Sequence, residues 1–598
     1  MGTPVSGAHA LARGAIAAGV SLVTSYPGGP ATEVVNAVLQ LTSADQVRVE
    51  WTSNEKVALE MAFGGSMAGA RSLLCVKGVG LNIALDPLMT INLSGCNGGF
   101  VLLVGDDPGA WGSQNEQDSR ALALAAELPL LEPTSVGNAS QAMAQAFQLS
   151  EEMGLPVIVR VTTALVLAEE QVAIGQRMYP SAEIATDPQS RTPRGFQREF
   201  MRWVVLPINA VSYHRRLHER LDTIQKRFES SPLNRVQGCG DLGLIASGFA
   251  AQKLAELMDG RAVAGARLLS LGTVYPLPTQ QIIAFLRSVQ SVLILEETDP
   301  LVERAVRDVA QQAGLSLPIY GRDTGHVPRV GELSASHIAA ALNRLLPGQE
   351  LGHSAEPSRS LPSRVPLCKE CPYIPTFDAL VEVINGLGGR GQAIVVGDPG
   401  CIARAQLPPY ELLDVKISLG SSIGIAAGMA LSQALSNGPG GERSVPSGEQ
   451  FRSEQRDVPD PGPSTVGVGG DRTGRGAAGG HPWIVALCGD SSLLHSGLGG
   501  LMDAARAGAR MLVLVLDNGT TALSGGQPHP ASPVDARGRP RRAVDLAGLG
   551  QQAGAQVVMV VDLDQGDSIR PAIQAAVDLD GLAVVIARGD CRRHPVRR

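Results

Sequence analysis

Short β-rich runs alternate with helical stretches along most of this chain. From Val20 to about Ala164 the β-rich runs are SLVTSYP, RSLLCVKG, FVLLVGDD and LPVIVRVTT, with Ala-rich segments between them. The pattern returns from Asp241 to about Leu346 in GLIASG, ARLLSLG and SVLILEE, and again from near Leu367. Such alternation is typical of βαβ units around a parallel sheet. The sequence therefore predicts an α/β protein with several sheets.

The chain has 598 residues, and a chain of this length normally folds into several domains, each with its own hydrophobic core. A polar, basic connector that turns helical through HRRLHERLDTIQKRFE and the Pro- and Ser-containing run SAEPSRSLPSRVP separate the α/β blocks. We predict an α/β domain at 1–172, a connector at 173–237, a smaller α/β domain at 238–350, a linker at 351–366 and a third α/β domain at 367–598. Within the third, residues 437–480 are rich in Gly, Pro, Ser and Arg, so we expect them to be disordered.

Composition narrows the classes of partner. A formal charge of -7 and a pI near 5.9 give no basic field for nucleic acid or an anionic membrane, so a small-molecule substrate is favoured. No uncharged apolar run approaches the ~20 residues of a membrane span, and no secretory signal is recognisable, so a cytoplasmic location is expected. Eight cysteines are too few for a disulfide scaffold in a chain of this length.

Two apolar runs near the C-terminus end in polar oxygen ligands. WIVALCGD ends at Gly489-Asp490-Ser491, and MLVLVLDN leads into Asn518-Gly519-Thr520. Ligands bind at the carboxyl edge of open parallel sheets, and a hard cation that bridges to phosphate needs oxygen donors. Asp490, the Asn518 side chain and the Thr520 carbonyl oxygen are therefore candidate ligands of Mg²⁺. The spacing, 518 − 490 = 28, leaves room for one helix and one strand and resembles the thiamine diphosphate signature.

The wording around these residues is more specific. GDSSLLHSGLGGL, LDNGTTALSGGQPHP, GDPGC (Gly397–Cys401) and LGSSIGIAAGM (Leu419–Met429) resemble the large subunit of indolepyruvate ferredoxin oxidoreductase, a thiamine diphosphate-dependent 2-oxo acid:ferredoxin oxidoreductase. The resemblance implies pyrimidine-binding and diphosphate-binding parallel-sheet domains, with a transketolase C-terminal-like α/β domain between them. The glycine-rich stretch alone could equally be a site of helix packing. The cofactor-contacting residues so implied are Gly397, Asp398, Gly420, Ser421, Gly489, Asp490, Ser491, Asn518, Thr520 and Thr521.

A buried glutamate must contact the cofactor's aminopyrimidine, so that the thiazolium carbon can lose its proton. Glu55 and Glu60 are the candidates in WTSNEKVALE, and five helical positions separate them by about 140°, so both cannot easily face one ring. The family places this glutamate before a helix of small residues, which selects Glu55. The alternative is a solvated charge at a helix start.

Two features concern the substrate. The loop Tyr26-Pro27-Gly28-Gly29-Pro30 resembles the family's YPGTP substrate loop, but Gly29 replaces a threonine whose hydroxyl is expected to meet the substrate carboxylate. This departure leaves the usual substrate open. Arg120 aligns with an arginine of the wider family that could clamp that carboxylate, and the alternative is an exposed arginine at a helix start.

Four cysteines bear on the path of electrons. The family's large subunit normally ends in a ferredoxin-like domain, and this chain has no such cysteine-rich tail, which makes a non-oxidative decarboxylase or carboligase the rival. Cys368, Cys371, Cys401 and Cys591 nevertheless resemble, in order and spacing, the ligands of a [4Fe–4S] cluster in pyruvate ferredoxin oxidoreductases. A structural zinc site or unconnected packing thiols are the alternatives.

The resemblance as a whole implies oxidative decarboxylation of a 2-oxo acid, and it suggests an aryl pyruvate as that acid. Coenzyme A would take the acyl group, and ferredoxin or a partner would take the electrons. A smaller partner subunit is expected, which would make the enzyme a heteromeric complex. A catalytically silent scaffold is the third possibility, and intact Glu55, Asp490 and Asn518 argue against it.

Overall fold

In the computed structural model the chain forms two compact units. The structure describes residues 3–172, 195–346, 351, 366–436, 481–566 and 568–595. The segment 437–480, for which the sequence predicts disorder, lies outside these residues, as do most of the predicted linker 351–366 and the first part of the predicted connector. The first unit comprises 1–363 and 524–542, and the second comprises 364–523 and 543–598.

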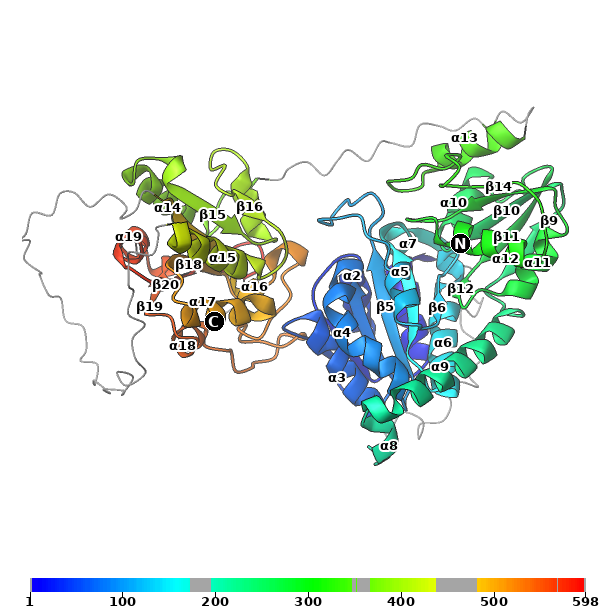
Figure 1. Ribbon diagram of the computed structural model, residues 1–598, viewed down its shortest axis with the longest axis horizontal. Coiled ribbons are helices and arrows are strands. Elements are labelled where there is room, and N and C mark those ends of the chain that lie inside the picture. The colour runs from blue at the N-terminus through cyan, green and yellow to red at the C-terminus, as the bar shows by residue number, and fades with distance from the viewer. Residues whose placement is uncertain are drawn as a thin grey trace, which may run out of the picture. The chain divides into compact units, whose positions relative to one another are not determined.

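The first unit is built on a seven-stranded sheet of order β12-β6-β7-β5-β4-β2-β3, in which only the edge strand β12 is antiparallel. Its central strands are buried along their whole length and mostly apolar because helices cover both faces (Figure 1). The strands are β2 Leu22–Ser25, β3 Arg48–Trp51, β4 Ser72–Lys77, β5 Phe100–Asp106, β6 Leu130–Leu131, β7 Val157–Thr162 and β12 Thr273–Tyr275, and an antiparallel pair of β1 Thr3–Ser6 and β8 Glu169–Val172 joins the chain's first and last strands in this region.

Two cores flank this sheet. Side chains of α1, α2 and α6 pack together on one face, and those of α3 and α4 pack on the other. Helix α9 continues over α4 towards the second sheet. The helices are α1 Gly7–Ala17, α2 Ala31–Leu41, α3 Glu55–Met67, α4 Gly78–Ser94, α5 Arg120–Ala125, α6 Val136–Met153, α7 Thr163–Leu167, α8 Phe200–Trp203 and α9 Pro207–Phe228.

A second sheet in the same unit has five strands in the order β14-β13-β10-β11-β9, parallel except for β9. Its inner strands are the predicted runs GLIASG, ARLLSLG and SVLILEE. The elements are β9 Arg235–Gly238, β10 Leu242–Ser247, α10 Ala250–Leu257, β11 Ala266–Leu271, α11 Thr279–Leu286, β13 Ser291–Leu295, α12 Leu301–Gln312, β14 Ile319–Tyr320 and α13 Ala335–Leu345.

The second unit contains a fully parallel six-stranded sheet of order β16-β15-β17-β18-β20-β19. The predicted α/β class with parallel sheets is thus confirmed. The elements are α14 Ile374–Gly386, β15 Ala393–Gly397, β16 Val415–Lys416, α15 Ser421–Ser436, β17 Trp483–Gly489, α16 Asp490–Ser492, α17 Leu498–Arg506, β18 Met511–Asp517, α18 Leu546–Gln552, β19 Val557–Asp562, α19 Arg570–Asp578 and β20 Leu582–Arg588.

One segment groups differently from the domain prediction. Residues 524–542 belong to the first unit, whereas the sequence assigned all of 367–598 to one domain. The physical reason is Arg537, whose guanidinium donates to backbone carbonyls that include those of Thr42, at 2.8 Å, and Val47, at 3.1 Å. No helix among the described residues is long and apolar enough to cross a membrane.

Candidate functional site

Each unit gathers predicted site residues at the carboxyl edge of its sheet, which is where ligands bind in open α/β sheets. In the second unit Asp490 follows β17 and Asn518 follows β18. These strands are hydrogen-bonded neighbours with Gly489 opposite Leu516, so the two residues emerge side by side. In the first unit Glu55 lies beyond β3, and the loop at Gly29 lies beyond β2.

Asp490 is buried and holds three backbone N–H groups. Its Oδ1 accepts from Ser491 at 2.7 Å, and its Oδ2 accepts from Asn518 at 3.0 Å and Gly519 at 2.8 Å. The carboxylate therefore fixes the turn that follows the neighbouring strand. Because a carboxylate oxygen has more than one lone pair, these bonds leave it able to bind a cation as well.

The turn after β18 supplies further oxygens. Asn518 and Thr520 are buried, the Asn518 Oδ1 accepts from the Thr520 N–H at 3.1 Å, and the Thr520 carbonyl accepts from Ala522 at 2.9 Å. Thr521 lies beside Ser491, with their hydroxyl oxygens 3.5 Å apart. Carboxylate, amide and carbonyl oxygens are the donors that Mg²⁺ takes when it bridges to phosphate. The predicted ligands therefore fit such an ion.

The start of α15 lies against the residues that follow Asp490. Gly420 has φ of +72°, and a Cβ there would come within 2.5 Å of the Gly497 nitrogen and 2.8 Å of the Ser492 oxygen. Glycine alone permits this approach. The Ser421 hydroxyl donates to the Ser418 carbonyl at 2.8 Å, so it stabilises the turn that begins the helix.

Asp398, which follows Gly397 at the end of β15, anchors the same helix start. It is fully buried, and its Oδ1 accepts from the Ser422 N–H at 3.0 Å. Burial raises the pKa of the Asp398 carboxyl. Its contacts place it as a support for α15, whose N-terminal N–H groups are suited to an anion such as a diphosphate.

Two further residues near Asp490 and Asn518 were not predicted from the sequence. His495 is buried in a π-helical turn, Leu493–Gly497, and such turns are frequent at functional sites. The only sequence signal for it is its position inside the matched run GDSSLLHSG. Tyr373 is buried, and its hydroxyl donates to the Leu516 carbonyl at 3.3 Å. Burial raises its pKa, and the nearby Asp490 carboxylate raises it further.

The four cysteines lie near one another in this unit. Burial raises the pKa of the Cys401 thiol to about 12; Arg404 opposes this, while the nearby sulfurs of Cys371, Cys591 and Cys368 reinforce it. Cys371 donates its N–H to the Cys368 carbonyl at 3.0 Å. The structure therefore brings together cysteines that the sequence separates by more than two hundred residues.

The spacing of these sulfurs can be compared with the geometry of a single tetrahedral ion. A tetrahedral zinc site with Zn–S near 2.3 Å requires sulfurs about 3.8 Å apart. Among the described residues, no three of these sulfurs lie within 4.8 Å of one another. The Cys591 N–H donates to the Asn518 carbonyl at 3.3 Å, so the cysteine group adjoins the turn that carries the oxygen ligands.

In the first unit Glu55 begins α3, after an Asn54 side chain that accepts from the Val57 N–H at 2.9 Å. The Glu55 carboxyl is buried beneath α4: a Cβ on Gly80 would lie 2.4 Å from its Oε1. Glu60, the other candidate, is exposed and pairs with Lys56. The structure therefore does not show Glu55 as a solvated helix-start charge, because the carboxyl is withdrawn from water.

The loop at Gly29 faces a charged group of residues. A Cβ on Gly29 would lie 3.5 Å from the Glu33 Oε1, which is ordinary contact, so the backbone there admits a Cβ. Glu33 Oε2 is buried and has no hydrogen-bond partner among the described residues. Burial lowers the pKa of Lys77, which donates to the Gly112 carbonyl at 2.9 Å, and Asp107 and Glu33 oppose this shift.

Arg120 requires a correction, because it is not exposed. Its guanidinium has 0% exposure and bonds to both oxygens of Asp118, to Glu296 Oε2 at 2.9 Å and to the Asp299 carbonyl at 2.8 Å. It thus joins the residues after β5 to those after β13. Because the guanidinium already bonds to these groups within the protein, the structure gives no support to Arg120 as a substrate clamp.

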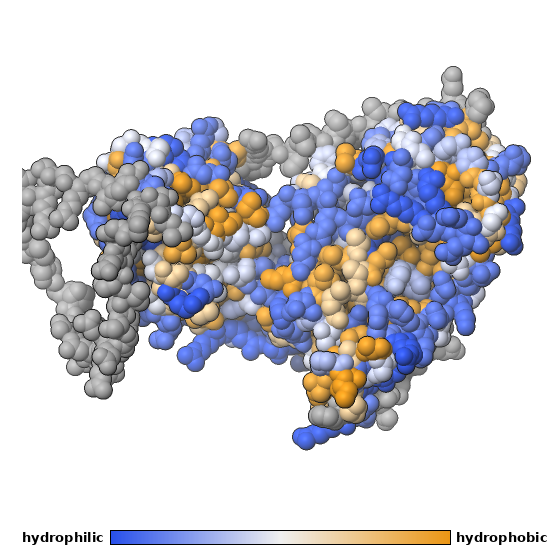
Figure 2. Space-filling view, viewed as in Figure 1, coloured by the Kyte–Doolittle hydropathy of each residue, from blue (hydrophilic) through white to orange (hydrophobic). Residues whose placement is uncertain are grey.

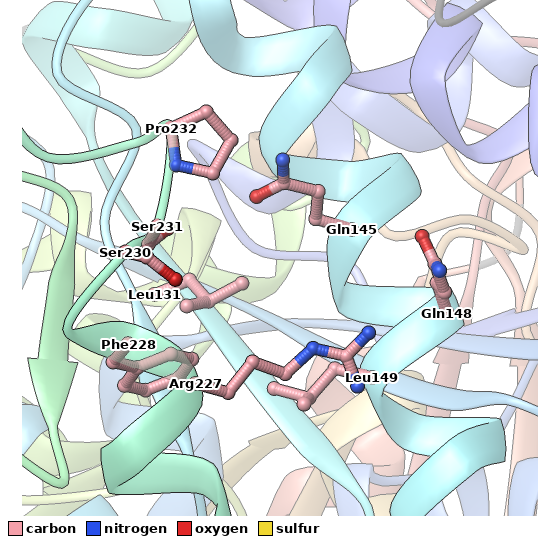
Figure 3. Close-up of a pocket in the computed structure, with 9 residues that line it drawn as sticks. All are labelled: Leu131, Gln145, Gln148, Leu149, Arg227, Phe228, Ser230, Ser231 and Pro232. Carbon is pink, nitrogen blue, oxygen red and sulfur yellow. The ribbon is translucent and has the colours of Figure 1, made fainter.

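Figure 3 shows a cavity in the first unit. It has a volume of about 240 Å³, and its walls come from α6 and from the end of α9. No predicted site residue lines it. Arg227, its charged lining residue, forms an ion pair with Glu152.

Comparison with known proteins gives two family matches. Residues 13–199 match the pyruvate flavodoxin/ferredoxin oxidoreductase, thiamine diP-binding model, and residues 472–587 match the C-terminal TPP-binding domain of thiamine pyrophosphate enzymes. These ranges contain Glu55 and the Asp490–Asn518 pair respectively.

Similar proteins include curated archaeal chains. Indolepyruvate oxidoreductase subunit IorA of Pyrococcus abyssi is 33% identical over 98% of this chain and 85% of its own. The protein of that name from Thermococcus kodakarensis is 32% identical over 99% and 86%. Among solved structures, a 2-oxoglutarate:ferredoxin oxidoreductase from Magnetococcus marinus is 16% identical, covering 57% of this chain and 64% of its own at a TM-score of 0.41.

Proposed function

The chain belongs to the indolepyruvate oxidoreductase subunit IorA family, and from that membership we propose that it carries out the oxidative decarboxylation of a 2-oxo acid, with an aryl pyruvate as the favoured substrate. Thiamine diphosphate-dependent 2-oxo acid oxidoreduction is the activity of this class. The finer proposal concerns the residues that hold the cofactor, the route of the electrons and the acceptor of the acyl group.

The observation that carries the proposal is the contact between the oxygen ligands and the cysteines. Asp490 holds the turn at Asn518 through two backbone N–H groups, and the Asn518 carbonyl accepts from Cys591. A cofactor diphosphate with Mg²⁺ on Asp490, Asn518 and Thr520 would therefore lie next to a group of thiols. That adjacency suits a reaction in which electrons leave the cofactor.

Thiamine diphosphate, when bound, supplies a thiazolium carbon that adds to the 2-oxo carbon and accepts the electrons left when carbon dioxide departs. Glu55 would hold a proton at the pyrimidine nitrogen. Because its carboxyl is buried beneath α4, few competing water molecules can reach that proton. The group at Glu33 and Lys77, beside Gly29, would orient the substrate.

For the four cysteines we favour a [4Fe–4S] cluster over zinc. A four-iron cube holds its thiolates further apart than a single tetrahedral ion does, and these sulfurs are more widely spaced than zinc requires. Cys591 is buried, and Cys371 and Cys401 are partly buried and pack against the core of this unit. The electrons would pass from it to ferredoxin or to a partner, and coenzyme A would take the acyl group.

A smaller subunit is the expected partner. The related chains are named as subunits, and large apolar side chains are exposed on α8 and the start of α9, where Figure 2 shows an apolar patch. Its members include Met201, Ile208 and Val211, the last two 89% and 73% exposed. A heteromeric complex would cover a surface of this kind.

The test is anaerobic purification of the chain with its smaller subunit, followed by iron, sulfide and thiamine analysis. We expect about four irons per chain at these cysteines. Cys401→Ser should lower iron and sulfide together, whereas Cys239→Ser, at an exposed cysteine outside the group, should leave both unchanged. Thiamine without iron would instead support the non-oxidative decarboxylase or carboligase.

A further inference from the structure

Glu127, His214 and His218 form a cluster that contains none of the predicted site residues. One ligand atom from each lies within 4.8 Å of the other two, and this is the only such group of three or more acidic, histidine or cysteine residues in the described part of the chain. Both histidine Nε2 atoms contact the carboxylate, His214 at 2.6 Å from Oε2 and His218 at 2.7 Å from Oε1.

The two histidines point to the same side of α9 because they are four residues apart. Tyr213, Leu217 and Leu221 form the buried stripe of the helix, and each histidine follows a residue of that stripe. The rings therefore stand at the margin of the packed face, half exposed, with their centroids 4.4 Å apart. Packing of the stripe fixes the backbone from which they project.

Glu127 approaches from a different element. It follows α5 in the left-handed region, with φ of +51°, and its N–H donates to the Leu124 carbonyl at 3.0 Å. Leu128, the next residue, is fully buried and fixes the turn. The carboxylate is thus held against α9 from a separate anchored segment.

The charge of the cluster suits a cation. Burial raises the pKa of Glu127, but hydrogen bonds from His218 and His214 outweigh this effect and lower the pKa overall. The group is therefore a carboxylate at neutral pH. Its ion pairs among the described residues are with these two histidines, and no lysine or arginine forms one with it. With neutral imidazoles the three side chains carry one negative charge.

We propose that Glu127, His214 and His218 form a binding site for a divalent transition metal ion, zinc in the first instance, that fastens α9 to the turn after α5. Two imidazole nitrogens and one carboxylate oxygen are a common zinc ligand set. Ligands about 2.05 Å from a tetrahedral ion lie roughly 3.4 Å apart. Each histidine–carboxylate contact, now 2.6 or 2.7 Å, needs to lengthen by less than an ångström to admit the ion, and water would complete its coordination.

The experiment compares zinc binding by the full chain and by variants. After chelator treatment, zinc is titrated against a chromogenic chelator. We expect the wild type to bind one more zinc per chain than His214→Ala/His218→Ala, whatever the cysteines bind. Glu127→Gln, which keeps the shape and loses the charge, should weaken that site at least tenfold, as loss of even an outer-shell partner does by roughly 10–100-fold. His326→Ala is the matched control, because its ring contacts Thr324 outside the cluster.

Two further readouts locate the ion. Cobalt bound at this site in place of zinc should give a visible absorption band without a thiolate charge-transfer band. That visible band should be lost when the two histidines are replaced. Zinc should raise the melting temperature of the wild type and of His326→Ala by more than it raises that of the double variant, because an ion that binds the folded state stabilises it. Equal zinc stoichiometry and equal melting shifts in the wild type and the double variant would overturn the proposal, and so would unchanged affinity in Glu127→Gln.

Discussion

The Oδ2 atom of Asp490 lies 3.0 Å from the backbone nitrogen of Asn518. This hydrogen bond ties the end of one parallel strand to the turn after its neighbour. It fixes the relative positions of the two side chains that would bind Mg²⁺ and, through the Asn518 carbonyl, reaches Cys591. A single buried carboxylate therefore organises both the oxygen ligands and their contact with the cysteines.

Asp490→Asn should abolish tight binding of thiamine diphosphate. The amide keeps the size of the side chain but removes a charge that the cation requires, and we expect the affinity for cofactor and Mg²⁺ to fall at least about 100-fold, beyond the effect of losing an outer-shell partner. Fluorescence titration of the metal-free protein would measure it. Asp503→Asn is the control, because that carboxylate is 77% exposed on the nearby α17 and pairs with Arg506. Equal affinity for the cofactor in the two variants would show that Asp490 is not part of the binding site.

Glu55→Gln should retain the cofactor and lose turnover. The neutral amide cannot exchange a proton with the pyrimidine, so exchange of the thiazolium C2 proton, followed by NMR in deuterated water, should slow by about 100-fold or more. Glu60→Gln lies on the same helix and is exposed, so it should exchange at the wild-type rate. If both variants exchange normally, another group activates the cofactor.

Gly29→Thr should change substrate preference without disturbing the fold. A Cβ at this position would meet nothing closer than the Glu33 carboxylate, at 3.5 Å. A hydroxyl there could bond to a substrate carboxylate, and one bond to a charged group corresponds to roughly tenfold in KM. Steady-state assays over a panel of 2-oxo acids would detect this. Gly64→Thr on α3, where a Cβ meets open space, controls for the substitution itself. An unchanged KM for every acid would exclude Gly29 from substrate contact.

Asp118→Asn should destabilise the first unit by about 3–5 kcal/mol, because it leaves the buried Arg120 without its closest partner. Burial opposes ionisation, but Arg120 and Arg160 hold the pKa of Asp118 below its usual value near 4. The stabilising contribution of the ionised Asp118 carboxyl is thus present above about pH 4 and is lost as the pH falls through its lower, folded-state pKa. Denaturant unfolding at pH 7 would measure the loss. Asp323→Asn, which breaks an exposed pair with Arg304, should cost less than about 1 kcal/mol; similar losses in the two variants would contradict a special role for the buried pair.

Local sequence was enough to predict the sheets and the ends of β17 and β18. Fully buried parallel strands need continuous apolar residues, and polar residues stand out where such runs stop. The burial of Arg120 could not be foreseen, because its partner Glu296 is 176 residues away in the chain. The same holds for the grouping of 524–542 with the first unit, which depends on Arg537 reaching the carbonyls near Thr42.

The Glu127–His214–His218 cluster was equally hidden. A pair of histidines four residues apart on a basic helix is an ordinary surface pattern, and only the fold brings a carboxylate from 87 residues earlier to face it. The cysteines differ, because the spacing of Cys368 and Cys371 already indicated a shared site. Their contact with the turn at Asn518 required the register of β18 and β20.

The most direct test of the central claim is the ratio of electrons to carbon dioxide. The chain and its smaller subunit are mixed anaerobically with thiamine diphosphate, Mg²⁺, coenzyme A, indolepyruvate and methyl viologen, and the reduced dye and released carbon dioxide are measured together. We predict two reduced viologens for each carbon dioxide, with formation of an acyl-CoA. Carbon dioxide released with aldehyde and without dye reduction would contradict the assignment as an oxidoreductase.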